Sequence, residues 1–109
     1  MKVVFNRSVP LRGYIAMTLW PFVFVRSENR RLYDAATENH EAIHGEQQKE
    51  MLVLPFLLWY GMEWLVRLLC SGDARKAYRD VSFEREARAN EKDMEYIGKR
   101  KRYAWTGYL

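Results

Sequence analysis

The only two histidines of the chain, His40 and His44, lie four residues apart in the stretch HEAIH. They fall within residues 31–51, a segment of helix-forming residues with no proline and one glycine, which predicts a single amphipathic helix. Helical periodicity collects one stripe along this segment: Leu32, Ala36, His40, Ile43 and Gln47. The histidines are therefore predicted to face inward or into a cleft.

Two histidines at this spacing project from one face of a helix, so they can present two imidazole nitrogens to a single ion. Zinc binds neutral imidazole at close range in a tetrahedral shell. Glu41 is offset round the helix from His40, where its carboxylate can reach a water on the metal without binding the metal. Because zinc lowers the pKa of such a water, Glu41 is predicted to accept its proton as the water attacks a carbonyl carbon. The alternative is that both histidines are ordinary residues of a charged helix.

A catalytic zinc site needs a third protein ligand. The chain has no further histidine and only one cysteine, Cys70, so this ligand is expected to be a carboxylate. Residues 82–101 predict a last helix, with Ser82 as N-cap, that offers three glutamates: Glu84, Glu86 and Glu91. The small Ala87 one turn after Glu84 allows close packing against the histidines, which favours Glu84 narrowly. For the other two, solvated helix charge is the favoured interpretation.

The whole chain predicts one α+β domain over residues 1–109, large enough for a single modest core. The first quarter is rich in β-branched and aromatic residues, which predicts short N-terminal antiparallel strands, the last at residues 22–26. Residues 51–70 are the most apolar segment, yet a proline, a glycine and two charged residues interrupt it. A buried or surface-lying helix is therefore favoured over a membrane span. A turn is predicted at CSGDARK. The expected order is thus strands followed by three helices.

The formal net charge is +4, and four basic residues form the run 99–102. Such a run suits a nucleic acid or an anionic lipid surface as partner. It equally suits a solvated helix end, where cations complement the helix dipole, so nucleic acid is the weaker prediction. The apolar run at 14–25 is too short for a span and lacks a small-residue cleavage site. With no internal disulfide available, we expect a cytoplasmic protein, with membrane association as the alternative.

The order of these elements resembles the gluzincin metallopeptidases, in which HExxH on one helix is combined with a glutamate ligand on a later helix. The resemblance covers roughly residues 15–97. The step E-x-x-A in FEREARANE is similar to the third-ligand motif of the membrane-linked branch of that group. The small size resembles the single-domain forms called minigluzincins.

This resemblance implies a zincin-like fold with His40, His44 and Glu84 as Zn²⁺ ligands and Glu41 as general base and acid. The implied substrate is a peptide or protein. In the family, an edge strand beside the metal helix binds substrate in extended form, which here points to residues 22–26.

Two features depart from the family pattern. Members often carry an aspartate directly after the E-x-x-A step to support a ligand histidine, whereas this chain has Arg88 there. A substitute is expected from one of three nearby side chains, or the site is weaker: Asn90, Glu91 and Asp93. The residue that stabilises the oxyanion is open between several arginines and three tyrosines: Tyr60, Tyr96 and Tyr103.

The leading hypothesis is a zinc metallopeptidase with a very small fold, and a subsidiary hypothesis is that its aromatic tail at residues 103–109 holds it latent. The alternatives are a non-catalytic zinc-binding protein that keeps the ligands, and a basic module that binds nucleic acid or anionic lipid. A peripheral membrane contact is a further hypothesis, although core packing is the favoured use of the rings concerned: Trp59, Tyr60 and Trp64. A wide aromatic surface on so short a chain also suggests a homodimer.

Overall fold

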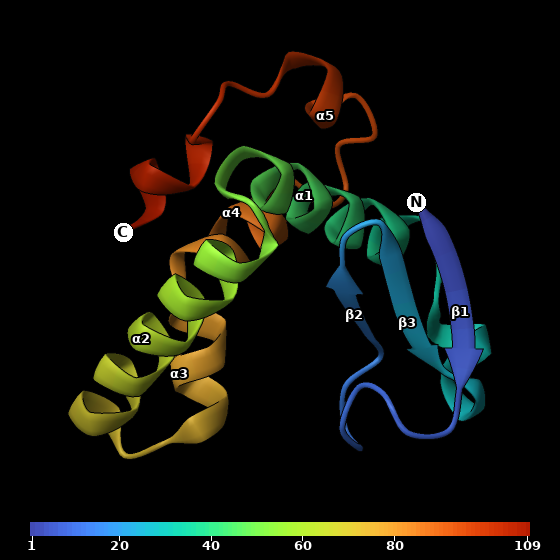
Figure 1. Ribbon diagram of the computed structural model, residues 1–109, viewed down its shortest axis with the longest axis horizontal. Helices are drawn as coiled ribbons and strands as arrows, with labels where there is room; N and C mark the ends of the chain where they lie inside the picture. Colours follow the sequence, from blue (N-terminus) through green and yellow to red (C-terminus); the bar gives the residue numbers. More distant parts are fainter.

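The computed structural model describes residues 1–109 and has an α+β architecture, with a small sheet beside a group of helices (Figure 1). The sheet has three strands: β1 (Lys2–Asn6), β2 (Ala16–Leu19) and β3 (Phe22–Arg26). The α-helices are α1 (Ala35–Met51), α2 (Val53–Ser71), α3 (Ala74–Asp80), α4 (Ser82–Asn90) and α5 (Tyr96–Lys99). Short 3-10 helices precede α1 and end the chain: Ser27–Leu32 and Ala104–Tyr108. The predicted α+β class is confirmed, whereas the helices outnumber the three expected.

The sheet is mixed, which corrects the prediction of antiparallel strands only. β3 lies in the centre, antiparallel to β2 on one side and parallel to β1 on the other. The chain reverses after β1 and again after β2, and β3 inserts between them, so β1 and β3 run in the same direction. Sequence patterning does not distinguish the two arrangements, because side chains alternate with period two in both.

α1 begins at Ala35, later than predicted, because the residues before it form a 3-10 helix and a cap. The side chain of Asp34 accepts a hydrogen bond from the Thr37 backbone N–H at 2.8 Å. The helix ends at Met51 as predicted. Leu52, with a φ of 68°, then turns the chain directly into α2.

α2 confirms the apolar helix predicted at residues 51–70. Gly72 ends it in the left-handed conformation and donates its N–H to the Leu68 carbonyl at 2.7 Å. The turn predicted after it is shorter than expected, since Asp73 caps α3 by accepting from the N–H groups of Arg75 and Lys76. A glycine followed by an aspartate was the overlooked signal for one helix ending and the next beginning. α3 runs back beside α2 (Figure 1).

The last helix predicted over residues 82–101 is interrupted, because α4 ends at Asn90 and α5 is a separate short turn. Ser82 is not the N-cap, a position that Val81 holds. Instead the Ser82 N–H and hydroxyl both donate to the carboxylate of Glu63 on α2, at 2.8 and 2.5 Å. Glu63 thus supplies the acceptor that a capping box would have provided, and it ties α4 to α2.

A small apolar cluster lies between α2, α4 and the C-terminal tail, and consists of Phe56, Val81, Phe83 and Trp105. The ring of Phe83 lies 4.4 Å from that of Phe56 and 4.7 Å from that of Trp105. Tyr60 and Trp64 pack against this cluster from α2, as predicted for these rings. The tail is therefore part of the core.

α2 is long and apolar enough to cross a membrane, judged by its length and composition. In the structure it lies along the outside of the fold, and Phe56 is the only residue of this helix that is buried. Of the two forms predicted for this segment, it takes the surface-lying one.

Candidate metal centre

α1 buries a polar face against β2, α2 and α4. The polar side chains on this face are Asn39, His40, Glu41, His44, Gln47 and Gln48. Ile43 is the only large apolar residue that the helix buries. Burying polar groups costs stability unless each finds a partner, so a face of this composition marks a specialised site.

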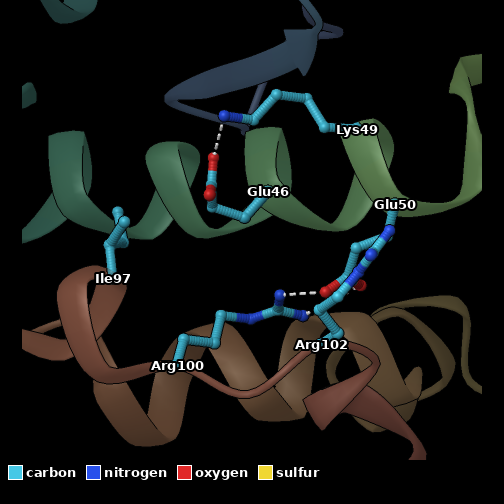
Figure 2. A pocket seen from close by; sticks show the side chains of 6 residues that line it. All are labelled: Glu46, Lys49, Glu50, Ile97, Arg100 and Arg102. Carbon is cyan, nitrogen blue, oxygen red and sulfur yellow. Dashed lines mark hydrogen bonds and ion pairs between the residues drawn. The ribbon is translucent and has the colours of Figure 1, made fainter.

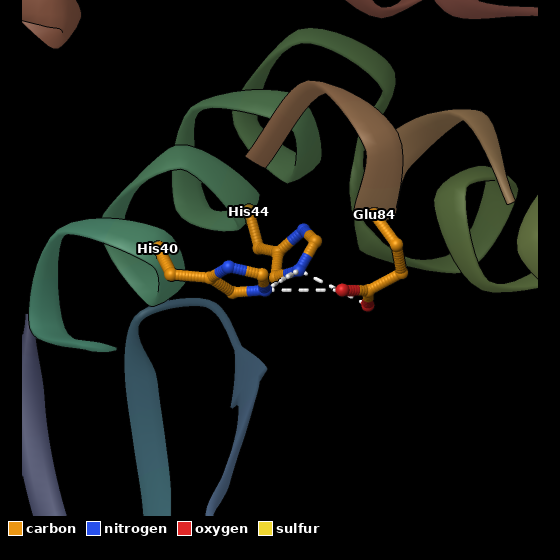
Figure 3. Close-up of side chains that lie close together, drawn as sticks. All are labelled: His40, His44 and Glu84. Carbon is orange, nitrogen blue, oxygen red and sulfur yellow. Dashed lines mark hydrogen bonds and ion pairs between the residues drawn. The ribbon is translucent and has the colours of Figure 1, made fainter. Parts of the chain in front are cut away.

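Three side chains on this face and on α4 converge (Figure 3). The Nε2 atoms of His40 and His44 are 3.1 Å apart. Glu84 places Oε1 3.0 Å from Nε2 of His40 and Oε2 3.1 Å from Nε2 of His44. The structure thus brings together the three residues implied as ligands, and it separates Glu84 from Glu86 and Glu91, which the sequence left open.

The donor set and its spacing fit a metal ion. Two imidazole nitrogens and one carboxylate are a common ligand set for zinc, and bonds of about 2.0–2.2 Å in a tetrahedral shell place ligand atoms about 3.3–3.6 Å apart. The separations between the three groups are 3.0–3.1 Å, with one Glu84 oxygen facing each histidine, so they lie a little below that range. Three protein ligands leave one tetrahedral position for water or substrate. The group can therefore hold a metal ion with an open position.

His40 is oriented by Glu91. Its Nδ1–H donates to Oε1 of Glu91 at 3.0 Å, which leaves Nε2 for the ligand position. Of the three side chains considered as support for a histidine, Glu91 is therefore the one that contacts His40, and its interpretation as solvated helix charge was wrong. Asn39 donates to the carbonyl oxygens of Glu91 and Asp93 at 2.9 and 3.0 Å, which fixes the turn that carries Glu91.

His44 is oriented by Gln47, a residue of the predicted stripe to which the sequence assigned no role. The His44 Nδ1–H donates to Oε1 of Gln47 at 2.8 Å. Nε2 of Gln47 donates in turn to the Phe83 carbonyl at 3.1 Å and to Oε1 of Glu86 at 3.0 Å. Because both amide protons of Gln47 are used, its oxygen is left to face the histidine.

Glu86 is fully buried (0% exposed), so its interpretation as solvated charge was also wrong. Nε of Arg100 donates to Oε2 of Glu86 at 2.5 Å, and the Tyr96 hydroxyl donates to the same oxygen at 2.6 Å. The other end of Arg100 reaches Glu50 on α1 (Figure 2). Burial alone would raise the pKa of Glu86, but the hydrogen bonds from Arg100, Tyr96 and Gln47 lower it. The ion pair of Arg100 and Glu86 thus fixes Gln47, the residue that orients His44.

Tyr60 is the tyrosine, among the three considered for the oxyanion, that reaches the metal centre. Its hydroxyl donates to Oε2 of Glu84 at 2.8 Å. Burial, and then the Glu84 carboxylate, raise the pKa of Tyr60 well above its ordinary value. Tyr96 is bonded to Glu86, and the hydroxyl of Tyr103 lies 3.4 Å from the Glu50 carbonyl. Tyr60 therefore orients the candidate ligand Glu84, whereas Tyr96 and Tyr103 contact other residues.

Glu41 lies beside the three ligands without joining them. Its Oε2 is 4.0 Å from Nε2 of His40, and its Oε1 accepts a hydrogen bond from the Thr18 hydroxyl at 2.9 Å. Burial raises the pKa of the Glu41 carboxyl, against the lowering effect of His44 and His40. The buried Thr18 belongs to β2, so the sheet fixes this carboxylate in place.

His44 and Glu84, the two most buried residues of the three, shift the pKa of each other. Burial disfavours charge on both, but the Glu84 carboxylate, helped by Glu41 and Gln47, raises the pKa of His44 to about 9. His44 and His40 in turn hold the pKa of Glu84 well below its ordinary range. Without metal, a proton on His44 therefore neutralises Glu84 at neutral pH.

The edge strand beside α1 is β2, which corrects the expectation that residues 22–26 serve as the edge. Those residues form β3, whose two edges are already paired with β1 and β2. β2 pairs only with β3, so its other edge carries no strand. The side-chain amide of Gln48 bridges part of this edge, donating to the Thr18 carbonyl at 2.7 Å and accepting from the Trp20 N–H at 2.6 Å.

Two residues of the basic run 99–102 form ion pairs within the fold. Arg100 is buried between Glu50 and Glu86, and Lys99 pairs with Asp93 at 2.8 Å. Lys101 and Arg102 are exposed and form no ion pair.

The C-terminal tail packs against α4. Arg85 donates to the Tyr108 carbonyl at 2.5 Å, and Asn90 to the Tyr108 hydroxyl at 3.2 Å, while Trp105 enters the core. These contacts involve none of the metal-site residues. Latency through the tail stays a prediction.

No family model, curated protein or solved structure matches the chain.

Proposed function

We propose that this protein is a zinc-dependent metallopeptidase with His40, His44 and Glu84 as ligands and Glu41 as general base. The observation that carries the proposal is the convergence of two Nε2 atoms and one carboxylate at 3.0–3.1 Å, with a second buried carboxylate beside them. Each histidine has an oxygen acceptor on its Nδ1, which presents Nε2 as the ligand atom. Zinc is preferred because this ligand set suits its tetrahedral shell.

Zinc, when bound, would polarise the scissile carbonyl and lower the pKa of the attacking water. Glu41 would accept the proton of that water and deliver it to the leaving amine. Thr18 holds one oxygen of the Glu41 carboxylate, so the other is free to face the reacting atoms. A raised pKa suits this exchange, because it brings the carboxyl closer to the pH at which it must both accept and release a proton.

The substrate is proposed to be a polypeptide in extended form. The edge of β2 that carries no strand lies beside α1, and Thr18 on this strand bonds Glu41. A peptide added to this edge would run past the general base, and it would displace the Gln48 side chain from the Thr18 carbonyl and the Trp20 N–H. Addition of a strand to a sheet edge reads the main chain of the ligand rather than its side chains. This predicts preference for unfolded segments over compact domains.

The test compares the wild type with Glu41→Gln on an unfolded protein substrate after zinc loading. Glu38→Gln is the matched control, since Glu38 is exposed on the same helix. We expect about one zinc per chain in all three, and a loss of cleavage of at least about 100-fold in Glu41→Gln only. Zinc binding without cleavage in the wild type would instead identify a non-catalytic zinc protein. Equal cleavage by the wild type and Glu41→Gln would remove Glu41 from the mechanism.

A further inference from the structure

α2 has the reverse of the charge distribution of an ordinary surface helix. Its two charged residues face the protein: Glu63 bonds Ser82, and Arg67 lies 3.6 Å from Glu63. The outward side carries large apolar side chains, each half exposed or more, which we call the α2 apolar face: Leu54, Leu58, Met62, Leu65, Val66 and Leu69. Amphipathic surface helices place their charges outward, so this helix is built to meet an apolar phase.

We propose that α2 lies flat on an anionic membrane surface, with the α2 apolar face at the boundary between headgroups and acyl chains. Helices that lie in this plane combine an apolar face with nearby basic residues that contact lipid headgroups. Here the charge comes from the elements next to α2, because its own charges point inward.

Exposed basic side chains stand at both ends of α2. Lys101 and Arg102 lie near its start, where Arg102 shares a pocket with the end of α1. Near its end, α3 carries three exposed basic residues: Arg75, Lys76 and Arg79. Lys76 lines the same groove as Met62 and Val66, where it pairs with Asp80 at 3.1 Å, so Arg75 and Arg79 are the cations of α3 outside an ion pair. Cations at both ends suit a surface of anionic headgroups.

The packing of α2 favours a flat orientation over a transmembrane one. α3 runs beside α2 with its basic side chains, and Glu63 fastens the start of α4 to the middle of α2. If α2 crossed the bilayer, these charged and polar groups would enter the hydrocarbon, which is strongly unfavourable. Lying flat keeps them on the aqueous side.

Charge also argues against a second copy of the chain as the partner. Because both ends of α2 are basic, pairing two copies in either a parallel or an antiparallel arrangement brings cations close together. Juxtaposed like charges oppose association. An anionic surface removes this repulsion.

The test is binding of the full chain to vesicles of phosphatidylcholine with and without phosphatidylserine. In Leu58→Glu/Leu65→Glu, two exposed leucines of the α2 apolar face become acidic (68% and 50% exposed). The matched control is Leu32→Glu/Met94→Glu, because both side chains are exposed (55% each) and lie outside α2, α3 and the basic run. We expect the first variant to bind anionic vesicles more than about 100-fold more weakly than the wild type. The control adds the same two negative charges and should bind like the wild type.

A second variant, Lys101→Gln/Arg102→Gln, should weaken binding to anionic vesicles by roughly 20-fold and leave binding to neutral vesicles unchanged. Equal binding by wild type and Leu58→Glu/Leu65→Glu, or no vesicle binding by the wild type, would overturn the proposal. A wild-type dimer in light scattering that the leucine variant dissolves would assign the face to a second copy. Tryptophan quenching by lipids brominated at the bilayer centre rather than near the headgroups would indicate a span. None of these readouts depends on zinc or on peptidase activity.

Discussion

Nδ1 of His40 lies 3.0 Å from Oε1 of Glu91, a residue just beyond the end of α4. The carboxylate that orients His40 therefore comes from the turn after the helix. The turn is itself held by Asn39, the neighbour of His40 on α1. The two halves of the site therefore fix each other.

Glu91→Ala should lower zinc affinity by about 10–100-fold, because Nδ1 of His40 loses the acceptor that orients the ring. Affinity is measured by competition with a chromophoric chelator. Glu95→Ala is the control, since Glu95 is exposed nearby. Unchanged affinity in Glu91→Ala would mean that the hydrogen bond does not orient the ligand.

Zinc binding should release about one proton per ion at pH 7. The pKa of His44 is raised to about 9 without metal, so its imidazole is protonated at neutral pH and must lose that proton to bind zinc. Apparent affinity should then rise about tenfold per pH unit up to about pH 9 and level off above it. Calorimetry in buffers of different ionisation enthalpy counts the protons. Affinity that is flat between pH 7 and 9 would contradict the shift.

The same pKa predicts a pH dependence of the metal-free fold. A histidine whose folded pKa exceeds its unfolded value of 6.5 contributes stability that is fully present below pH 6.5 and is lost as the pH rises to about 9. The free energy of unfolding of the metal-free wild type, measured in urea, should therefore fall over this window. His44→Gln is the comparison, and it should show a smaller fall.

Arg100→Met should destabilise the protein by about 3–5 kcal/mol, because it leaves the fully buried Glu86 and the carboxylate of Glu50 without their cation. Lys101→Met is a matched control, since the neighbouring lysine is exposed and unpaired. Chemical denaturation gives both values. If the two variants unfold alike, the ion pair contributes nothing that the chain needs.

Local patterns predicted the parts of the site that depend on neighbours in sequence. Helical spacing alone aligns His40 and His44 toward one point, and Glu84 was narrowly preferred because Ala87 permits close helix packing. By contrast, Gln47 and Arg100 act through Glu86, and this contact joins segments far apart in the chain. A basic residue within a run of four carries no sign that it pairs inside the fold.

The order of the strands in the sheet could not be predicted from the sequence for a related reason, since it also depends on contacts between distant segments. Short strands were predicted in the first quarter of the chain, with bounds only for residues 22–26, but which strand is the edge depends on where β1 attaches. Since β1 joins β3, the edge passes to β2 and brings Thr18 to Glu41. The hydrogen bond that holds Glu41 is thus a consequence of strand order.

Trp105→Ala should destabilise the protein by about 3–5 kcal/mol, because the indole fills the core beside Phe83. Leu109→Ala, an exposed change in the same tail, should have little effect.

Latency through the tail cannot be tested by truncation after Arg102 alone, because that truncation also removes Trp105 and would weaken the fold. Tyr108→Ala separates the two effects: it removes the ring and the hydroxyl that accepts from Asn90, while the carbonyl that accepts from Arg85 and the indole of Trp105 are kept. Increased cleavage by Tyr108→Ala at unchanged stability would support latency, and unchanged cleavage would leave the tail a purely structural role.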